Sequence, residues 1–152
     1  MILKTEKIVK KFTDYNQHLN VASYVRIFDK AADIMLDMFK MGELSAKKEK
    51  KTTFVAEMHT AYFQEVKLGD FVETHLTHIS HDKKRIHYRL SMFHKEKKHL
   101  IAKHEVISLF VNLKNRKVIE FDSDRLEAMR KYINSNVSKF DSSELVFSGK
   151  LK

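Results

Sequence analysis

The chain has 152 residues, and its 29 Lys and Arg outnumber its 20 Asp and Glu, for a formal net charge of +9. With 43% hydrophobic residues, we expect one domain over residues 1–152 with a substantial core. The absence of Cys excludes disulfides, thiol nucleophiles and cysteine-held metals. No apolar run reaches the roughly 18 residues of a membrane span, and charge follows soon after Met1. We therefore expect a soluble, cytoplasmic protein that does not bind membranes.

The basic excess is concentrated in short runs at 47–51, 83–85, 95–98 and 114–117. Such a surface attracts polyanions, either nucleic acid or a phosphorylated small molecule such as a nucleotide or coenzyme A. No basic stripe with interleaved aromatic residues, glycine-rich phosphate loop or helix-turn-helix spacing is present. A small molecule is thus the expected partner and nucleic acid is not, although nucleic-acid binding stays open as an alternative that steep salt dependence would reveal.

The first half of the chain predicts a short strand and then a long helix. Residues 3–12 are weakly patterned as a strand, and 14–20 are polar. From Asn20, a good N-cap residue, apolar residues recur at helical intervals to Met41, and Gly42 is expected to stop the helix. Most of the helix circumference is apolar, so other elements must wrap it.

After an expected loop at 43–51, the hydrophobic period changes to two. One face of the next strand carries Phe54, Ala56, Met58 and Tyr62, and the other carries Val55, Glu57, His59, Ala61 and Phe63. Further strands are expected at 71–79, 86–92, 100–111 and 118–121, with spacings that favour antiparallel neighbours.

The C-terminal part predicts a second helix over about 123–138, capped by Asp122 or Ser123. The tail at 141–152 is expected to be loosely held. One long helix followed by meandering strands is typical of an α+β fold in which an antiparallel sheet curls around the helix.

The polar cluster before the long helix is the main candidate for chemistry. Asp14, Asn16 and His18 alternate, so in an extended segment they share one side. The unpaired N–H groups of a helix N-terminus stabilise a developing oxyanion or phosphate there, and a nearby carboxylate acts as base or nucleophile. The structural alternative is that Asp14 and Asn20 only turn and cap the chain while His18 packs.

The cluster also carries a family resemblance. The run DYNQHLNVASY at 14–24 resembles the Asp-x-Asn-x-His-x-Asn signature that opens the central helix of hotdog-fold thioesterases of the 4-hydroxybenzoyl-CoA thioesterase-like superfamily. It is similar also to plant acyl-carrier-protein thioesterases, which share the Gln at position 17. A second run, YFQEVKLGD at 62–70, resembles the family's link between its second and third strands. The resemblance covers about residues 5–120. Many bacterial relatives have Gly-His-Met where this chain has Gln17-His18-Leu19, which leaves the subfamily open.

The resemblance implies an α+β hotdog fold and an acyl-CoA thioesterase without a cofactor. Asp14 matches the family's catalytic aspartate, as base or nucleophile, and Asn16 and His18 match its polar catalytic partners. Backbone N–H groups near Asn20 and Tyr24 would polarise the thioester carbonyl and bind substrate. The family places active sites at a subunit interface, which implies a homodimer or homotetramer. A second chain could then contribute Glu57, with His59, to substrate binding, and a plain surface or interface role is the alternative for these two residues.

Three other interpretations remain. The fold can bind acyl-CoA without turning it over, it can act on an acyl carrier protein, or, as the least favoured case, it can be a dehydratase. The nine His suggest a metal, but His75 and His78 differ by an odd number and so point to opposite faces of a strand. The run from His94 to His99 does not match the His-Glu-x-x-His pattern either, so no metal site is expected.

Overall fold

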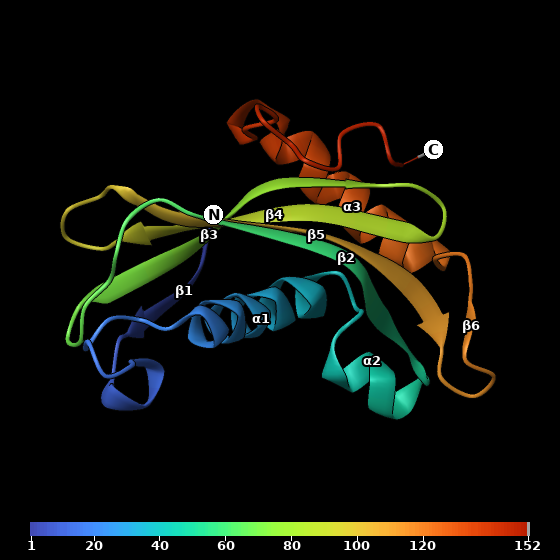
Figure 1. Ribbon diagram of the computed structural model, residues 1–152. Helices are drawn as coiled ribbons and strands as arrows, with labels where there is room; N and C mark the ends of the chain where they lie inside the picture. Colours follow the sequence, from blue (N-terminus) through green and yellow to red (C-terminus); the bar gives the residue numbers. More distant parts are fainter. Residues whose placement is uncertain (152) are drawn as a thin grey trace.

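A computed structural model describes residues 1–151 and shows a curled antiparallel sheet with one long helix on its concave side (Figure 1). The sheet order is β1-β3-β4-β5-β2, with β6 paired to β5. The strands are β1 (Ile2–Lys7), β2 (Lys51–Tyr62), β3 (Phe71–His81), β4 (Arg85–His94), β5 (Leu100–Asn112) and β6 (Lys117–Val118), and the helices are α1 (Val21–Met38), α2 (Glu43–Lys48) and α3 (Ser123–Asn136). Of the helices in these residues, none has the length and apolar character to span a bilayer.

The start of α1 is as the sequence predicted, but its end is not. Asn20 is the N-cap, and the apolar stripe is buried against the sheet. The helix ends at Met38 rather than Met41, because Lys40 takes the left-handed conformation, with φ of 60°. Gly42 is instead the N-cap of α2, which replaces the expected loop. A Cβ at Gly42 would lie 1.8 Å from Oδ1 of Asp37, so glycine is needed there for close approach.

Two strands are shorter than predicted. β1 ends at Lys7, and a 3-10 turn at Lys10–Phe12 follows it. β6 holds only two residues. Beyond it, the Phe121 ring stacks on Phe110, and the backbone N–H of Phe121 donates to the carbonyl of Lys83 at 2.9 Å. The predictions for β3, β4 and β5 are confirmed, and each runs slightly further than its hydrophobic pattern.

A β-bulge reverses the predicted faces of Phe54 and Val55 in the first part of β2, whereas the faces predicted from Glu57 onwards are correct. Val55 pairs with Ser108, but Glu57 pairs with Ile107, so the register shifts at Ala56. Partners across an antiparallel pair share a face. Val55 therefore lies on the inner face with Met58, and Phe54 lies on the outer face with Glu57. The alternation rule fails because the extra residue reverses the phase of the strand.

A second bulge, between Leu76 and His78 in β3, corrects the prediction for the histidines. His75 pairs with Ser91 and His78 with Arg89, so the two rings share the outer face rather than opposite faces. The stated reason against a metal site was therefore wrong. Within residues 1–151, no three His, Asp and Glu side chains come together in a metal-binding arrangement.

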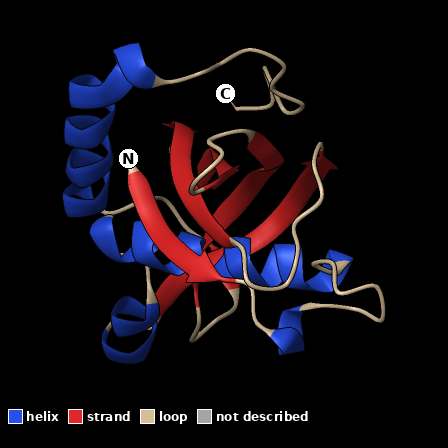
Figure 2. Cartoon of the chain, turned by 90° about the vertical axis from the view of Figure 1, so that its left-hand side faces the viewer, coloured by secondary structure: helices blue, strands red, loops and turns tan. Residues whose placement is uncertain are grey.

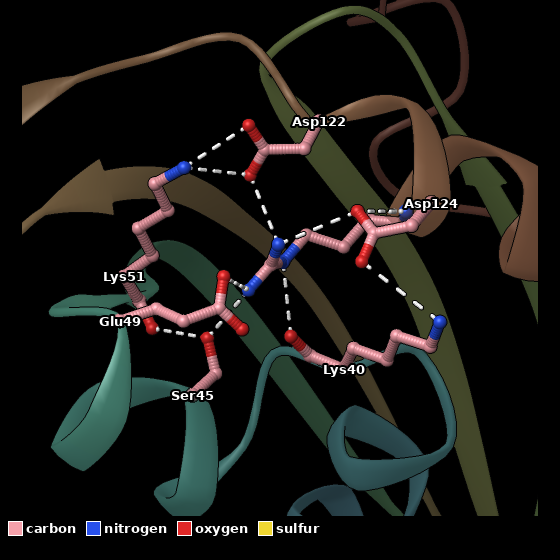
Figure 3. A network of polar contacts seen from close by, with 7 residues as sticks. Lys40, Ser45, Glu49, Lys51, Asp122 and Asp124 are labelled. Carbon is pink, nitrogen blue, oxygen red and sulfur yellow. Dashed lines mark hydrogen bonds and ion pairs between the residues drawn. The ribbon is translucent and has the colours of Figure 1, made fainter.

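α3 is tied to α2 and to the end of α1 by a buried arginine (Figure 3). Asp122 is the N-cap, but its carboxylate binds Lys51 and Arg125 instead of capping the helix. The Arg125 guanidinium, 1% exposed, donates to the carbonyl of Lys40 and the hydroxyl of Ser45. It also pairs with carboxylates at Glu49, Asp122 and Asp124. This network fixes the turn that follows α1.

The C-terminal tail is clamped to the outer face of the sheet, which corrects the expectation of a loose end. α3 lies beside the sheet, and the segment that follows it runs back over the sheet to the C-terminus (Figure 2). Arg89 donates to the carbonyl oxygens of Asp141 and Ser143. The Glu105 carboxylate accepts backbone N–H bonds from Val146 and Phe147, both at 2.8 Å. Two buried charges thus hold the tail through its backbone.

Candidate active site

The polar segment before α1 forms a tight turn. The backbone N–H of Asp14 donates to the carbonyl of His18, and that of Gln17 donates to the carbonyl of Asp14, both at 3.0 Å. Gln17 has a φ of 60°, and the Asp14 carboxylate accepts the backbone N–H of Asn16 at 2.8 Å. The predicted extended segment, with three side chains on one side, is therefore wrong.

This turn is fixed by the segment that follows β2, residues 63–68. The backbone N–H of Leu19 donates to the carbonyl of Val66 at 2.8 Å, and that of Leu68 donates to the carbonyl of Gln17 at 3.0 Å. These bonds join positions that are about fifty residues apart, so local sequence does not reveal them. Together they hold the turn directly ahead of the first residue of α1.

The N-terminus of α1 keeps two backbone donors for a ligand. The Asn20 side chain accepts the N–H of Ser23 at 2.9 Å, and its carbonyl accepts that of Tyr24 at 3.2 Å. The N–H groups of Val21 and Ala22 are not bonded by this cap, and both residues lie on the exposed first turn. They carry the positive end of the helix dipole, so they suit an oxygen that gains negative charge.

A cavity of about 330 Å³ opens beside this helix terminus, lined by Val21, Tyr24, Tyr62, Phe63, Gln64 and Glu65. The rings of Tyr24 and Tyr62 meet edge to face, with centroids 4.9 Å apart at 74°. The Tyr24 hydroxyl donates to the carbonyl of Gln64 at 3.5 Å. Burial raises the pKa of Tyr24, and the nearby Tyr62 and Glu65 add to that rise.

Glu65 connects the cavity to the turn. Its carboxylate lies 3.4 Å from Nδ1 of His18, and Lys67 approaches it at 3.7 Å. His18 and the start of α1 therefore lie close to Glu65, but Asp14, Asn16 and His18 are not among the residues that line the cavity. Because the segment is a turn, the side chains of Asp14, Asn16 and His18 do not share one side as they would in the predicted extended segment.

The other two predicted site residues lie elsewhere in this chain. Glu57 and His59 are on the outer face of β2, as the period-two pattern indicated for these two residues, with the sheet between them and α1. Glu57 pairs with Lys150 of the tail at 2.9 Å. His59 lines a separate cavity of about 190 Å³ with Arg89 and Glu105, among others. One chain alone does not bring these residues to the end of α1.

Besides Val21, four lining residues were absent from the predicted site: Tyr62, Phe63, Gln64 and Glu65. They were part of the second motif, and their placement beside Tyr24 follows from the antiparallel pairing of β2 with β5, which ends at Tyr62. The sequence signal was the run of two aromatic residues, an amide and a carboxylate directly after a strand. Nothing in that run indicates which helix it will meet.

Comparison with known proteins places the fold. A family model described as the thioesterase-like superfamily matches residues 9–129. A Pseudomonas aeruginosa protein named betainyl-CoA thioesterase is 26% identical over 125 residues, covering 80% of this chain and 79% of that protein.

Two solved structures share the architecture. A Staphylococcus aureus protein in complex with CoA has a TM-score of 0.80 at 23% identity, over 95% of this chain and 89% of that one. A 1,4-dihydroxy-2-naphthoyl-CoA thioesterase from Synechocystis has a TM-score of 0.74 at 14% identity, over 84% of this chain and 93% of that one. At these identities the structures establish a common fold.

Proposed function

Because the chain belongs to the thioesterase-like superfamily, we propose that it hydrolyses the thioester of an acyl-coenzyme A to a free acid and coenzyme A. The antiparallel sheet curled around α1 is the hotdog fold that the sequence resemblance predicted. The observation that carries the proposal is the end of α1, where two spare N–H donors, a cavity and the Asp14 turn lie together.

The chemistry follows from that placement. The N–H groups of Val21 and Ala22 bind the thioester oxygen and stabilise the charge that develops on it. Asp14 takes a proton from water, the resulting hydroxide adds to the carbonyl carbon, and the C–S bond breaks as the sulfur is protonated. In the alternative route the Asp14 carboxylate attacks the carbonyl carbon, the C–S bond breaks and coenzyme A leaves as its thiolate, and water then hydrolyses the resulting mixed anhydride while its proton goes to the thiolate. His18, within reach of Glu65, is the proposed partner in proton transfer, and Asn16 orients the reacting groups.

The names of the compared proteins support coenzyme A as the carrier. The Pseudomonas relative is named for a CoA thioester, and the Staphylococcus structure contains CoA. The net charge of +9 suits a carrier with several phosphates. Hydrolysis of acyl carrier protein thioesters and binding without turnover are the alternatives that the assay below separates.

The first prediction concerns Asp14. We expect Asp14→Asn to lower kcat for acyl-CoA hydrolysis by about 100-fold or more, because the amide neither accepts the proton nor attacks the carbonyl. Thiol release is followed with a thiol reagent over short, branched, long and aromatic acyl-CoA esters. The absence of Cys keeps the background low. Glu127→Gln, an exposed carboxylate on α3, is the matched control and should hydrolyse at the wild-type rate.

Other results would redirect the proposal. Equal turnover by Asp14→Asn and wild type would show that Asp14 is neither the base nor the nucleophile. Turnover of acyl carrier protein esters alone would favour that carrier, and tight binding without turnover would favour a binding module. A single turnover in ¹⁸O-labelled water distinguishes the two routes, since label enters Asp14 only if an anhydride forms.

We also propose that two copies of the chain associate along β2. This strand ends the sheet, and it exposes five large apolar side chains on and just after its 12 residues: Phe54, Val55, Met58, Tyr62 and Phe63. A long apolar edge strand in a soluble protein is normally covered. Pairing about a two-fold axis would bring Glu57 and His59 of one copy towards the other, which is the arrangement required for their predicted substrate-binding role.

A further inference from the structure

The turn at residues 67–70 leads into β3, and Asp70 closes it from both sides. The backbone N–H of Asp70 donates to the carbonyl of Lys67 at 3.1 Å, and the Asp70 carboxylate accepts the backbone N–H of Lys67 at 3.0 Å. Gly69 has a φ of 93°, which this kind of turn requires at its third position and which other residues rarely adopt. One carboxylate therefore sets the shape of a turn that the proposed chemistry does not use.

A buried histidine orients the Asp70 carboxylate. His94, at the end of β4, is 3% exposed, and its Nδ1 accepts the backbone N–H groups of Glu96 and Lys97, both at 3.2 Å. A neutral imidazole that accepts at Nδ1 carries its proton on Nε2. This Nε2 lies 3.5 Å from Oδ2 of Asp70, which is longer than a hydrogen bond but close enough to attract the negative oxygen. The same oxygen accepts the N–H of Lys67, so His94 favours the position in which the carboxylate closes the turn.

This closed turn also holds the turn that carries Asp14. It presents the N–H of Leu68 to the carbonyl of Gln17 at 3.0 Å, and the carbonyl of Val66, directly before it, accepts the N–H of Leu19 at 2.8 Å. Gln17 has a φ of 60°, a conformation that few residues other than glycine adopt without support from their surroundings. The backbone around Asp14 therefore keeps its shape because the neighbouring segment is bonded to it.

We propose that Asp70 is a positioning residue for thioester hydrolysis. Its carboxylate closes the turn at 67–70, and the bonds from this turn and from Val66 fix the backbone that carries the Asp14 carboxylate. The inference rests on the proposed function of the chain. Asp70 does not line the cavity, so its effect on the reaction passes through the backbone. A small displacement of a reacting group is enough to slow an enzyme strongly.

The cavity wall is held by different bonds. The N–H groups of Phe63 and Gln64 both donate to the carbonyl of Ile101 in β5, at 2.8 and 3.3 Å. Both residues line the cavity, and neither bond involves the turn at 67–70. Loss of the Asp70 carboxylate should therefore disturb the Asp14 turn more than the cavity, so we expect kcat to change more than KM.

The test compares two variants of Asp70 on the acyl-CoA ester that wild type hydrolyses fastest. We expect Asp70→Ala to lower kcat by about tenfold or more and to leave KM within about twofold of wild type, because the reacting carboxylate is displaced. Asp70→Asn keeps an oxygen that accepts the N–H of Lys67, so kcat should stay within about threefold of wild type.

The matched control is Asp82→Ala, which removes a carboxylate from the turn at the other end of β3. The Asp82 carboxylate accepts the backbone N–H groups of Lys84 and Arg85, at 2.9 and 2.8 Å. This variant also loses the closure of a turn, but one far from Asp14 along the strand, so it should keep the wild-type kcat. An equal fall of kcat in Asp70→Ala and Asp82→Ala would show a general loss of stability and overturn the positioning role.

Exchange of single backbone amides tests the same inference without turnover. In Asp70→Ala, the N–H groups of Leu19 and Leu68 should exchange with solvent deuterium at least about tenfold faster than in wild type, and that of Phe63 should not. Equal exchange of Leu19 and Leu68 in both proteins would overturn the inference. A wild-type kcat in Asp70→Ala would overturn it too and leave the thioesterase proposal intact. If wild type hydrolyses no ester, the thioesterase proposal fails, and the exchange rates alone decide whether Asp70 holds the turn.

Discussion

At the scale of single residues, His104 shows how a buried imidazole makes the fold sensitive to acid. It lies on the inner face of β5, its ring stacks on Phe28 with centroids 4.8 Å apart, and Nδ1 is 2.7 Å from the hydroxyl of Thr60. Burial lowers the pKa of His104 from 6.5 to about 4. The neutral ring is therefore the form that the folded protein accommodates.

The sign of the resulting pH dependence is fixed. The folded-state pKa of His104 is below its unfolded value, so its stabilisation is complete above pH 6.5 and is lost as the pH falls towards 4. We expect the unfolding free energy of wild type to fall by about 2 kcal/mol more than that of His104→Gln between pH 7 and pH 4.5. Urea denaturation at the two pH values measures this, and equal losses in both proteins would contradict it.

The residue-level predictions from sequence succeeded where a contact is local. Asn20 was identified as the N-cap because its type and position determine that role. The direction of Asp14, Asn16 and His18 was not predictable, because the turn depends on hydrogen bonds to Val66 and Leu68. The cavity wall at Tyr62 likewise depends on strand pairing with β5.

At the scale of elements, the C-terminal tail contributes to the stability of the sheet. Arg89 and Glu105 are both nearly inaccessible to solvent, and the tail backbone supplies much of their hydrogen bonding. Burial alone would raise the pKa of Glu105, but the N–H groups of Phe147 and Val146 and the ring of His87 outweigh it, so that pKa lies below its usual value. The charged form of Glu105 is the one that holds the tail.

Removing residues 141–152 should therefore destabilise the protein by at least about 3 kcal/mol, because Arg89 and Glu105 lose the hydrogen-bond partners that the tail backbone supplies. Urea denaturation with a tyrosine or circular dichroism signal gives the value. The control is Lys150→Ala, which removes an exposed ion pair to Glu57 and should cost less than about 1 kcal/mol. A truncated chain as stable as wild type would show that the clamp contributes nothing.

Elements with strong periodicity were predicted well, and the errors have a common cause. The long helix, the three central strands and the C-terminal helix follow from hydrophobic spacing. The faces of Phe54 and Val55 in β2, and of His78 relative to His75 in β3, were assigned wrongly because single-residue bulges at Ala56 and Thr77 leave no clear mark in a period-two pattern. The tail was taken as loose because its contacts use backbone groups, which every sequence possesses.

At the scale of the whole molecule, the assembly can be tested through the exposed edge. Met58 is 53% exposed on the inner side of β2. If two copies pair there, Met58→Lys places a charge in the interface, and we expect dissociation to monomers in sedimentation equilibrium. Val118→Lys introduces the same charge on β6, away from that edge, and should remain associated. A monomeric wild-type protein would overturn the pairing.

The overall architecture was predictable because it follows from one constraint. The apolar stripe of α1 must be buried, and a meander of antiparallel strands can curl against it. The prediction that other elements wrap the whole helix was wrong, because its opposite side, with Asp29, Lys30 and Asp33, is exposed in the chain. The covering of the outer face by the C-terminal tail was not predictable. It depends on Arg89 in β4 and Glu105 in β5, and single charges within alternating apolar strands do not indicate which segment they bind.

The edge-to-face pair of Tyr24 and Tyr62 makes the candidate site visible to spectroscopy without any label. The chain contains no Trp, so its near-ultraviolet emission comes from its five tyrosines, and two of them line the cavity. A ligand that enters the cavity and contacts these two rings would change their emission and their near-ultraviolet circular dichroism. Ligand entry can thus be followed in the unlabelled protein. The variants Tyr24→Phe and Tyr62→Phe then show which of the two tyrosines gives the signal.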